Sequence, residues 1–423
     1  MSTRLYLAHL AIPAFVLITA VQAYQRGFRG RTSTGLIALT LLWLAGGLVL
    51  FALRKRPRVA RMLPNITLSV LVGLVCAAIL ETAITLIMPV FATGLKRIQR
   101  PPNLRIQLVG NSLAIPGKRV DTVFTTNELG MRGPSLQDNR EAAFIILAIG
   151  GSTTECFALD DATAWPAVLG NLLSRGGRPV KVENTGVSGH TSSDHLYMLR
   201  TNPLVADADL ITFMVGANDL GAALAFEGRP VNAELQRRAD EGFGVFPLYS
   251  RSAIYKLAQF LTGTRSELRY DIEKFYEDMR RKRRQSRIIP LPDLRAAVQE
   301  YGERIRRLAE ECRGLRKRCL LITQPMLWRN DLSRQEIDAL WLGYVGPFEN
   351  PIGYISPGEL ETAMSEFNRR LLEVARAEQV EAFDLAARVP GNLTVYYDDA
   401  HYTNEGARIV AESIAEYLRP TVH

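Results

Sequence analysis

The sequence is poor in residues that bind metals, with only five histidines and four cysteines among 423 residues. A metal site would have to come from Asp398, Asp399 and His401, and no further His or Cys ligand pair accompanies them. The sequence also lacks a G-x-x-x-x-G-K-[ST] motif, which excludes a P-loop nucleotide site, and it has no internal repeats. We therefore expect no metal and no cofactor, with the Asp/His cluster as the one metal-site alternative.

Acidic residues are almost absent from the first 100 residues, which hold twelve lysines and arginines but only one acid, Glu81. The rest of the chain has a net charge of −3, from 39 basic and 42 acidic residues. The overall charge of +8 therefore arises in the N-terminal segment. This distribution favours anionic lipid headgroups over nucleic acid as a partner. The basic run RRKRRQSR (280–287) is interpreted as a solvated helix end.

Three long apolar runs occupy the same N-terminal segment, near residues 5–24, 35–53 and 66–94. Each is long enough to cross a bilayer as a helix, which takes about 20 residues. The sequence therefore predicts a multi-pass transmembrane anchor over residues 1–95, and a signal peptide in the first run is the alternative. The loop RKRPRVAR (54–61) is the most densely basic, so we place it in the cytoplasm and the rest of the protein, after the anchor, outside it.

After the anchor, residues 96–106 are predicted to form a linker, and residues 107–423 form a domain of alternating short strands and amphipathic helices. Such alternation predicts a parallel sheet with helices on both faces. The second and fifth strands alternate in polarity, as strands near a sheet edge do. The stretch near 220–290 fits this pattern poorly and is interpreted as an insertion. The predicted strands are 144–150, 180–185, 210–216, 319–324 and 380–385, and the predicted helices include 164–174, 294–313 and 357–378.

Unusual polar residues and glycines follow the predicted strands, at the edge where parallel sheets bind their ligands. The first strand ends in Gly150-Gly151-Ser152, where small residues would permit a sharp turn that exposes a nucleophilic serine. A serine that caps the next helix is the alternative. Gly189 and Asn218 follow the second and third strands. A glycine N–H and an asparagine amide can both donate to an oxyanion, and ordinary loops are the alternative for each.

A histidine lies near the C-terminus in YYDDAH (396–401), just before an amphipathic helix that begins at Thr403 or Asn404. Asp398 precedes His401 by three residues, and a carboxylate there can hold one imidazole nitrogen and orient the other toward Ser152. Asp399 is the rival for this role. The other four histidines have no acid in a comparable loop, so His401 is the best candidate for a general base.

Four blocks, GGST, NTGVSG, GAND and DDAH, occur in this order and together resemble the SGNH hydrolases, the GDSL-type esterase and lipase superfamily. The stretch TTNELGMRGP (125–134) resembles the lead-in of membrane-attached bacterial members. The likeness covers roughly residues 127–418, and the nucleophile block reads Gly-Gly-Ser where the family usually has Gly-Asp-Ser. It implies a flavodoxin-like three-layer α/β/α domain and ester hydrolysis through an acyl-enzyme. It also implies the roles of individual residues: Ser152 as nucleophile, His401 as base, Asp398 as its orienter, and Ser152, Gly189 and Asn218 as the oxyanion hole.

We therefore expect a serine esterase anchored in the cell membrane, acting on acylated glycans or lipids outside the cytoplasm, in the periplasm of a bacterium. O-acyl transfer to a surface polysaccharide is one alternative, and a non-catalytic envelope protein that only binds a polymer or a partner is another. Cys312 and Cys319 lie seven residues apart and either form a disulfide, which would fit an oxidising compartment, or are unrelated thiols.

Overall fold

The computed structural model describes residues 100, 103–109, 122–134, 143–229, 268–348 and 350–422, together with scattered positions between 52 and 84. The chain divides into two units, and the one formed by residues 96–234 and 263–423 contains most of what is described. The three predicted membrane spans lie almost entirely outside the described residues. Within the described positions, no helix combines the length and the apolar character needed to cross a bilayer. The anchor stays a prediction.

The centre of the described unit is a five-stranded sheet in the order β10-β7-β5-β3-β4, in which all pairs are parallel. Taken in chain order the strands follow the 2-1-3-4-5 arrangement of flavodoxin-like folds, so the predicted fold class is confirmed. All five predicted strands belong to this sheet, and the two expected near an edge, β4 and β10, lie at its edges. The strands are β3 (Phe144–Gly150), β4 (Val180–Asn184), β5 (Leu210–Met214), β7 (Arg318–Ile322) and β10 (Glu381–Phe383).

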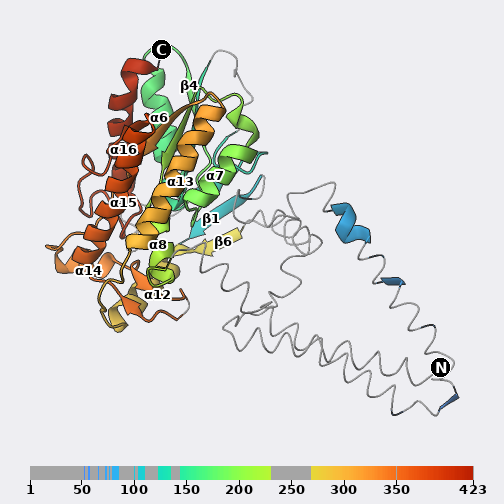
Figure 1. Cartoon of the computed structure of the whole chain (residues 1–423). Helices are drawn as coiled ribbons and strands as arrows, with labels where there is room; N and C mark the ends of the chain where they lie inside the picture. Colours follow the sequence, from blue (N-terminus) through green and yellow to red (C-terminus); the bar gives the residue numbers. More distant parts are fainter. Residues whose placement is uncertain are drawn as a thin grey trace. The chain divides into compact units, whose positions relative to one another are not determined.

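Helices cover both faces of this sheet, which is why the central strands are apolar on both sides (Figure 1). On one face α6 packs against α16, and on the other α13 packs between α7 and α15. The three predicted helices are present to within one residue at each end. The bounds are α6 (Trp165–Ser174), α7 (Ser192–Thr201), α8 (Ala217–Ala225), α13 (Arg295–Gly314), α15 (Pro357–Ala377) and α16 (Asn404–Leu418).

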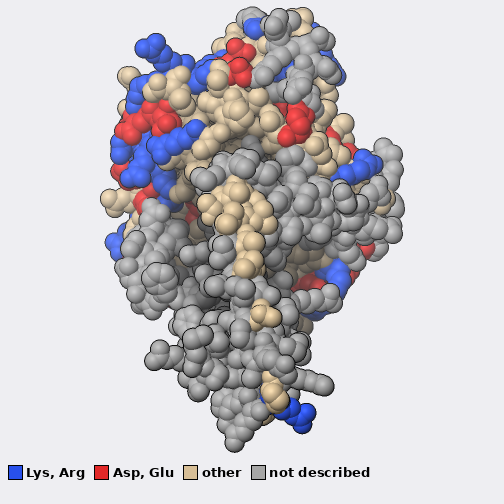
Figure 2. Space-filling model, turned by 90° about the vertical axis from the view of Figure 1, so that its right-hand side faces the viewer, with Lys and Arg blue, Asp and Glu red and all other residues tan. Residues whose placement is uncertain are grey.

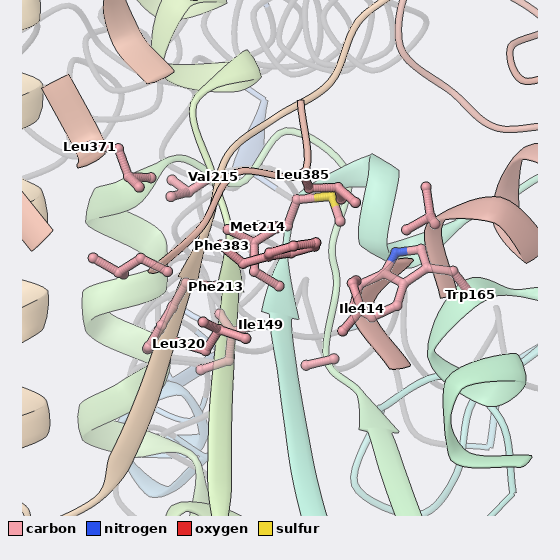
Figure 3. Packing of buried hydrophobic residues seen from close by; sticks show 14 of the residues in the cluster. Ile149, Trp165, Phe213, Met214, Val215, Leu320, Leu371, Phe383, Leu385 and Ile414 are labelled. Atoms are coloured by element: carbon pink, nitrogen blue, oxygen red, sulfur yellow. The ribbon is translucent and has the colours of Figure 1, made fainter. Parts of the chain in front are cut away.

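The core between the sheet and α6 and α16 reaches up to the strand ends. Figure 3 shows Trp165 of α6 next to Ile414 of α16 in this packing, and both side chains are fully buried. The indole of Trp165 donates a 3.0 Å hydrogen bond to the carbonyl of Thr153, which lies just beyond the end of β3. The largest buried side chain of the core therefore fixes the segment that carries the candidate nucleophile.

A second sheet, which the sequence did not predict, joins two segments far apart in the chain. Its order is β2-β1-β6, with β1 antiparallel to β2 and parallel to β6. The first strand starts inside the predicted linker 96–106, so the folded domain begins slightly earlier than expected. The third strand and the helix after it come from the predicted insertion. The elements are β1 (Arg105–Val109), β2 (Val123–Thr125), β6 (Leu268–Asp271) and α12 (Ile272–Gln285).

The basic run 280–287 is only partly a solvated helix end, so that interpretation needs correction. Arg283 is 7% exposed, and its guanidinium donates to the backbone carbonyls of Leu342 and Ile355. Arg280 donates a 2.6 Å hydrogen bond to the carbonyl of Tyr397. Two arginines of the run therefore fasten α12 to loops that border the candidate site, and the charges serve local structure.

Basic and acidic side chains are interspersed elsewhere on the described surface. Figure 2 shows them side by side on one face, as the near-balanced composition after residue 100 leads one to expect. On α16, Arg408 pairs with Glu405 and Glu412, one turn away on either side. Exposed pairs of this kind contribute only about 0.3–0.5 kcal/mol each, so they affect solubility more than stability.

Cys312 and Cys319 form a disulfide that joins the last turn of α13 to the start of β7. Both cysteines are buried. Of the two alternatives left open by the spacing, the structure therefore has the disulfide.

Candidate active site

Ser152 lies at the end of β3, as the first residue of the single-turn helix α5 (Ser152–Glu155). The two glycines before it are required by space. A Cβ on Gly150 would lie 2.0 Å from Thr154 Oγ1, and a Cβ on Gly151 would lie 2.4 Å from Asn218 Nδ2. Gly151 has a φ of −88°, which other residues also adopt, so space and not backbone conformation calls for a glycine there. The glycines instead let α5 and Asn218 approach the chain closely.

Ser152, His401 and Asp398 are connected by hydrogen bonds in that order. His401 Nε2 lies 2.8 Å from Ser152 Oγ, and His401 Nδ1 lies 2.7 Å from Asp398 Oδ2. Both residues of the C-terminal loop are held close to α16, whose N-terminal cap is Thr403. The structure therefore brings together three side chains that are far apart in sequence, in the geometry of a nucleophile, a base and an orienting carboxylate.

The two neighbouring aspartates of this loop face different partners. Asp398 Oδ1 accepts hydrogen bonds from the backbone N–H groups of Ala400 and His401, at 2.9 and 2.8 Å. Asp399 accepts from the indole of Trp328 at 2.7 Å and from the backbone of Trp341. Asp398, and not Asp399, is therefore the aspartate that contacts His401, and its role as the orienter stays a prediction. These N–H donors also occupy the carboxylate oxygens that the alternative metal site would need.

The surroundings of the pair favour an ionised carboxylate beside a basic imidazole. Burial disfavours the charged form of His401, but the charge of Asp398 and its hydrogen bond outweigh this and raise the pKa of His401 above its ordinary value. Burial likewise opposes ionisation of Asp398, but His401 and two backbone N–H groups lower the pKa of Asp398 overall. An imidazolium formed during the reaction would thus be stabilised where it forms.

Gly189 and Asn218, the expected oxyanion donors, border the same pocket as Ser152. Gly189 has a φ of +85°, a left-handed conformation that favours glycine, in the loop after β4. The amide nitrogen of Asn218 donates a 2.9 Å hydrogen bond to the carbonyl of His190, and its second hydrogen is left for a ligand. The three proposed donors are therefore gathered at one place, and their role stays a prediction.

The pocket above Ser152 and His401 has a volume of about 520 Å³. Much of its lining opposite the sheet comes from residues 268–285 and 325–356, which we call the wall segments. Arg100 also lines the pocket, and within the described residues no Asp or Glu does. The surface open to a substrate is thus largely aromatic and aliphatic. The aromatic residues in the lining are Phe157, Phe275, Tyr276, Trp328, Trp341, Tyr344, Phe348 and Tyr397.

The model of the GDSL-like lipase/acylhydrolase family matches residues 148–409, which span every candidate site residue. The chain belongs to this family. It is accordingly a serine ester hydrolase of the SGNH type, as the four sequence blocks implied. No curated protein matches it.

Solved structures similar to this acylhydrolase include an acetylxylan esterase from Geobacillus stearothermophilus. That match has 16% identity, covers 65% of this chain and 93% of that one, and has a TM-score of 0.37. Another is an α/β hydrolase from the metagenome of Lake Arreo in Spain, with 13% identity, coverage of 65% and 96%, and a TM-score of 0.37.

A buried polar cluster fixes the two loops that carry Gly189 and Asn218 in this acylhydrolase. Asp219 accepts hydrogen bonds from the backbone N–H of Ser192, at 3.2 and 3.1 Å, and one from its hydroxyl. Arg304 of α13 donates to Ser192 Oγ at 2.7 Å and to Asp219 at 3.3 Å. Asp219, which directly follows Asn218 in the chain, thereby braces its loop. Its partner Arg304 was missed, because it lies on a helix with an ordinary amphipathic pattern.

Arg132, in the stretch 125–134, binds the C-terminal end of α5. Arg132 is buried and donates to the backbone carbonyls of Glu155, Cys156 and Leu159, the position in which arginines stabilise helix C-termini. Glu155, on the same turn as Ser152, is also buried and binds Arg100 at 2.6 Å. The lead-in therefore holds the nucleophile turn from behind, and Arg100 holds it from the pocket side.

Proposed function

We propose that this acylhydrolase is anchored in the membrane and hydrolyses acyl esters outside the cytoplasm through an acyl-enzyme on Ser152. The observation that carries the catalytic part is the chain of hydrogen bonds from Ser152 through His401 to Asp398, opening on a pocket of about 520 Å³. A protein that only binds a polymer has no need for these two hydrogen bonds. The intact arrangement therefore favours catalysis over the non-catalytic alternative.

In the proposed reaction, Ser152 Oγ attacks the ester carbonyl while His401 Nε2 accepts its proton. His401 then returns the proton to the leaving alcohol, and Asp398 keeps the imidazole oriented throughout. The oxyanion is held by the N–H groups of Ser152 and Gly189 and by the amide of Asn218. Each such donor contributes about 3 kcal/mol, or roughly 10² to 10³ in rate. In the second step His401 takes a proton from water, which attacks the acyl carbonyl; the bond to Ser152 Oγ breaks, the acid leaves, and His401 returns the proton to Ser152.

The substrates we propose are O-acetylated glycans or acylated lipids of the cell envelope. The pocket lining supports an uncharged acyl ester, because it is rich in aromatic rings and the charge of Arg100 in it is paired with Glu155. Aromatic rings pack against the apolar faces of both sugars and acyl chains. The lining therefore fits both acetylated glycans and acylated lipids, and the activity assay compares the two.

The proposed location rests on three features of the chain. The apolar runs near 5–24, 35–53 and 66–94 are each long enough to span a bilayer, and the basic loop 54–61 favours the cytoplasmic side. The domain after the anchor then lies outside. The disulfide between Cys312 and Cys319 supports this side, because disulfides persist in oxidising compartments. A topology reporter fused after residue 423 should give an extracytoplasmic signal, and a cytoplasmic signal would overturn the proposed location.

The activity is tested with the purified full-length chain on aryl esters of short and long acyl chains and on acetylated glycans. Ser152→Ala should abolish turnover, and Ser413→Ala, the same change on the outer face of α16, should not. Equal turnover by the wild type and Ser152→Ala would sink the assignment. A new sugar ester among the products, in place of free acid, would establish O-acyl transfer instead of hydrolysis.

A further inference from the structure

Two tryptophans of one wall segment each hold one of the two buried aspartates before His401. The indole N–H of Trp341 donates a 2.9 Å hydrogen bond to Asp398 Oδ2. The indole N–H of Trp328 donates a 2.7 Å hydrogen bond to Asp399 Oδ1. Both aspartates are fully buried, so each indole serves a carboxylate that no water reaches from the surface. The two contacts are chemically alike, but only one touches the carboxylate bound to His401.

Asp398 Oδ2 receives two donors at once, the indole of Trp341 and Nδ1 of His401. Its other oxygen, Oδ1, receives the backbone N–H groups of Ala400 and His401. A carboxylate offers about four acceptor positions, so all of them are in use. The indole thus completes the shell of Asp398 and shares with His401 the oxygen that orients the imidazole.

The ring of Trp341 also lies parallel to the imidazole of His401. The interplanar angle is 7°, with ring centroids 6.4 Å apart, and Tyr397 lies within 15° of the same orientation at 5.8 Å. Trp341 is half-buried in the pocket lining. The backbone N–H of Trp341 donates a 2.7 Å hydrogen bond to Asp399 Oδ2, which fixes the position of the residue beside His401.

We propose that Trp341 is a positioning residue for ester hydrolysis, acting through Asp398. Its indole N–H holds Asp398 Oδ2 in the position where that oxygen binds His401 Nδ1. The same hydrogen bond weakens the electrostatic attraction between the carboxylate and the imidazolium. His401 is therefore held in the reactive orientation without being made so basic that it keeps its proton. The inference rests on the proposed function, because it assigns a role within the same Ser152, His401 and Asp398 set.

Other charged groups around His401 are unchanged by a substitution at Trp341. Asp398 and Asp399 face it from its own loop, and Glu155 faces it from α5. Asp399 in turn faces Arg283 of α12. Tyr397 is stacked on His401, and its hydroxyl lies 3.1 Å from the hydroxyl of Tyr276 on α12. A change in the titration of His401 in a Trp341 variant would therefore report the indole contact.

The test compares Trp341→Phe with Trp328→Phe in the full-length chain. Each variant keeps an aromatic ring and loses one indole N–H to a buried aspartate. In Trp341→Phe, the indole no longer shares Asp398 Oδ2, so the carboxylate attracts the protonated form of His401 more strongly. The acid limb of kcat/KM on an aryl ester should move up by about half a pH unit. We expect kcat to fall about tenfold, the effect of losing one hydrogen bond to a charged group, and KM to stay within about twofold. Trp328→Phe should leave the acid limb in place.

A second measurement follows the titration of His401 directly by the NMR signals of its ring, assigned by their loss in His401→Ala. Thermal unfolding of both variants checks that they fold. The titration should shift upward in Trp341→Phe alone. Equal titration in wild type and Trp341→Phe, or the same shift in Trp328→Phe, would overturn the proposal. This readout needs no turnover, so a wild type without esterase activity would overturn the proposed function and leave the positioning contact to be judged by the titration.

Discussion

The carboxyl edge of the sheet and the wall segments opposite it contribute to one site in different ways. The edge carries reactive groups, with Ser152 after β3 and the Gly189 and Asn218 loops after β4 and β5. The wall segments carry no group of the proposed reaction but donate the N–H groups that hold Asp398 and Asp399. The comparison teaches that the reactive side chains lie in short sequence motifs. The residues that hold the loop of Asp398 and Asp399 in place, such as Trp328 and Trp341, belong to none of these motifs.

The largest expected effect separates the two aspartates of one loop. Asp398→Asn should lower kcat about 10⁴-fold, because an amide there favours the wrong tautomer of His401. Asp399→Asn makes the same change one residue away, where the partners are Trp328 and the backbone of Trp341. It should lower the unfolding temperature but reduce kcat less than about tenfold. Steady-state kinetics and thermal unfolding measure both, and equal losses of kcat would show that the loop acts as a unit.

A methyl group at the nucleophile turn should have the next largest effect. Gly151→Ala places a Cβ 2.4 Å from Asn218 Nδ2, so the amide must move away from Ser152. We expect kcat to fall about 10²- to 10³-fold, as for the loss of one oxyanion donor. Gly314→Ala is the matched control, since a Cβ there has no heavy atom within 4 Å. Unchanged kinetics in Gly151→Ala would remove Asn218 from the proposed oxyanion hole.

A smaller effect is expected from the wall segments themselves. Arg283→Met removes the donors to the carbonyls of Leu342 and Ile355 and should lower the free energy of unfolding by about 2–4 kcal/mol. Arg284→Met, the same change at an exposed neighbour, should stay within about 0.5 kcal/mol. Denaturant unfolding of the full-length chain measures the difference. If the two variants unfold alike, α12 is not fastened to the pocket through Arg283.

The smallest expected effect concerns pH. Neutral His401 is the form that accepts the proton of Ser152, so kcat/KM should fall as the pH drops through the pKa of His401. Because Asp398 raises this pKa, the acid limb should lie above about 6.5, the ordinary histidine value. In Asp398→Asn any residual activity should show the limb at lower pH. A wild-type limb below the ordinary value would contradict the balance of burial and charge described for the pair.

Local patterns were sufficient to predict the sheet, because buried parallel strands are near-continuous apolar runs such as FIILAIG in β3. The site residues at the strand ends followed from the same pattern, combined with four short blocks. The same blocks favoured Asp398 over Asp399 as the partner of His401, with Asp399 left as the rival because adjacent residues in a loop can point either way. In the structure His401 Nδ1 lies 2.7 Å from Asp398 Oδ2, whereas Asp399 accepts from the indole of Trp328.

Long-range pairing was beyond the sequence. The sheet of β1, β2 and β6 joins the lead-in to the predicted insertion, and its central pairing connects Ile106 with Leu268, which no local pattern can indicate. The double glycine before Ser152 was recognised, but its reason was not, since the atoms it admits belong to Thr154 and Asn218. Buried arginines such as Arg283 look like surface charges in a sequence, because burial depends on partners from other segments.

The central claim is that His401 activates Ser152, and covalent trapping tests it most directly. The full-length chain is treated with a fluorophosphonate, and the modified peptide is identified by mass spectrometry. One adduct on Ser152 is predicted, forming far more slowly in His401→Ala and slowing in the wild type as the pH falls through the acid limb. An unmodified Ser152, or a rate of modification that is the same in His401→Ala, would contradict the account.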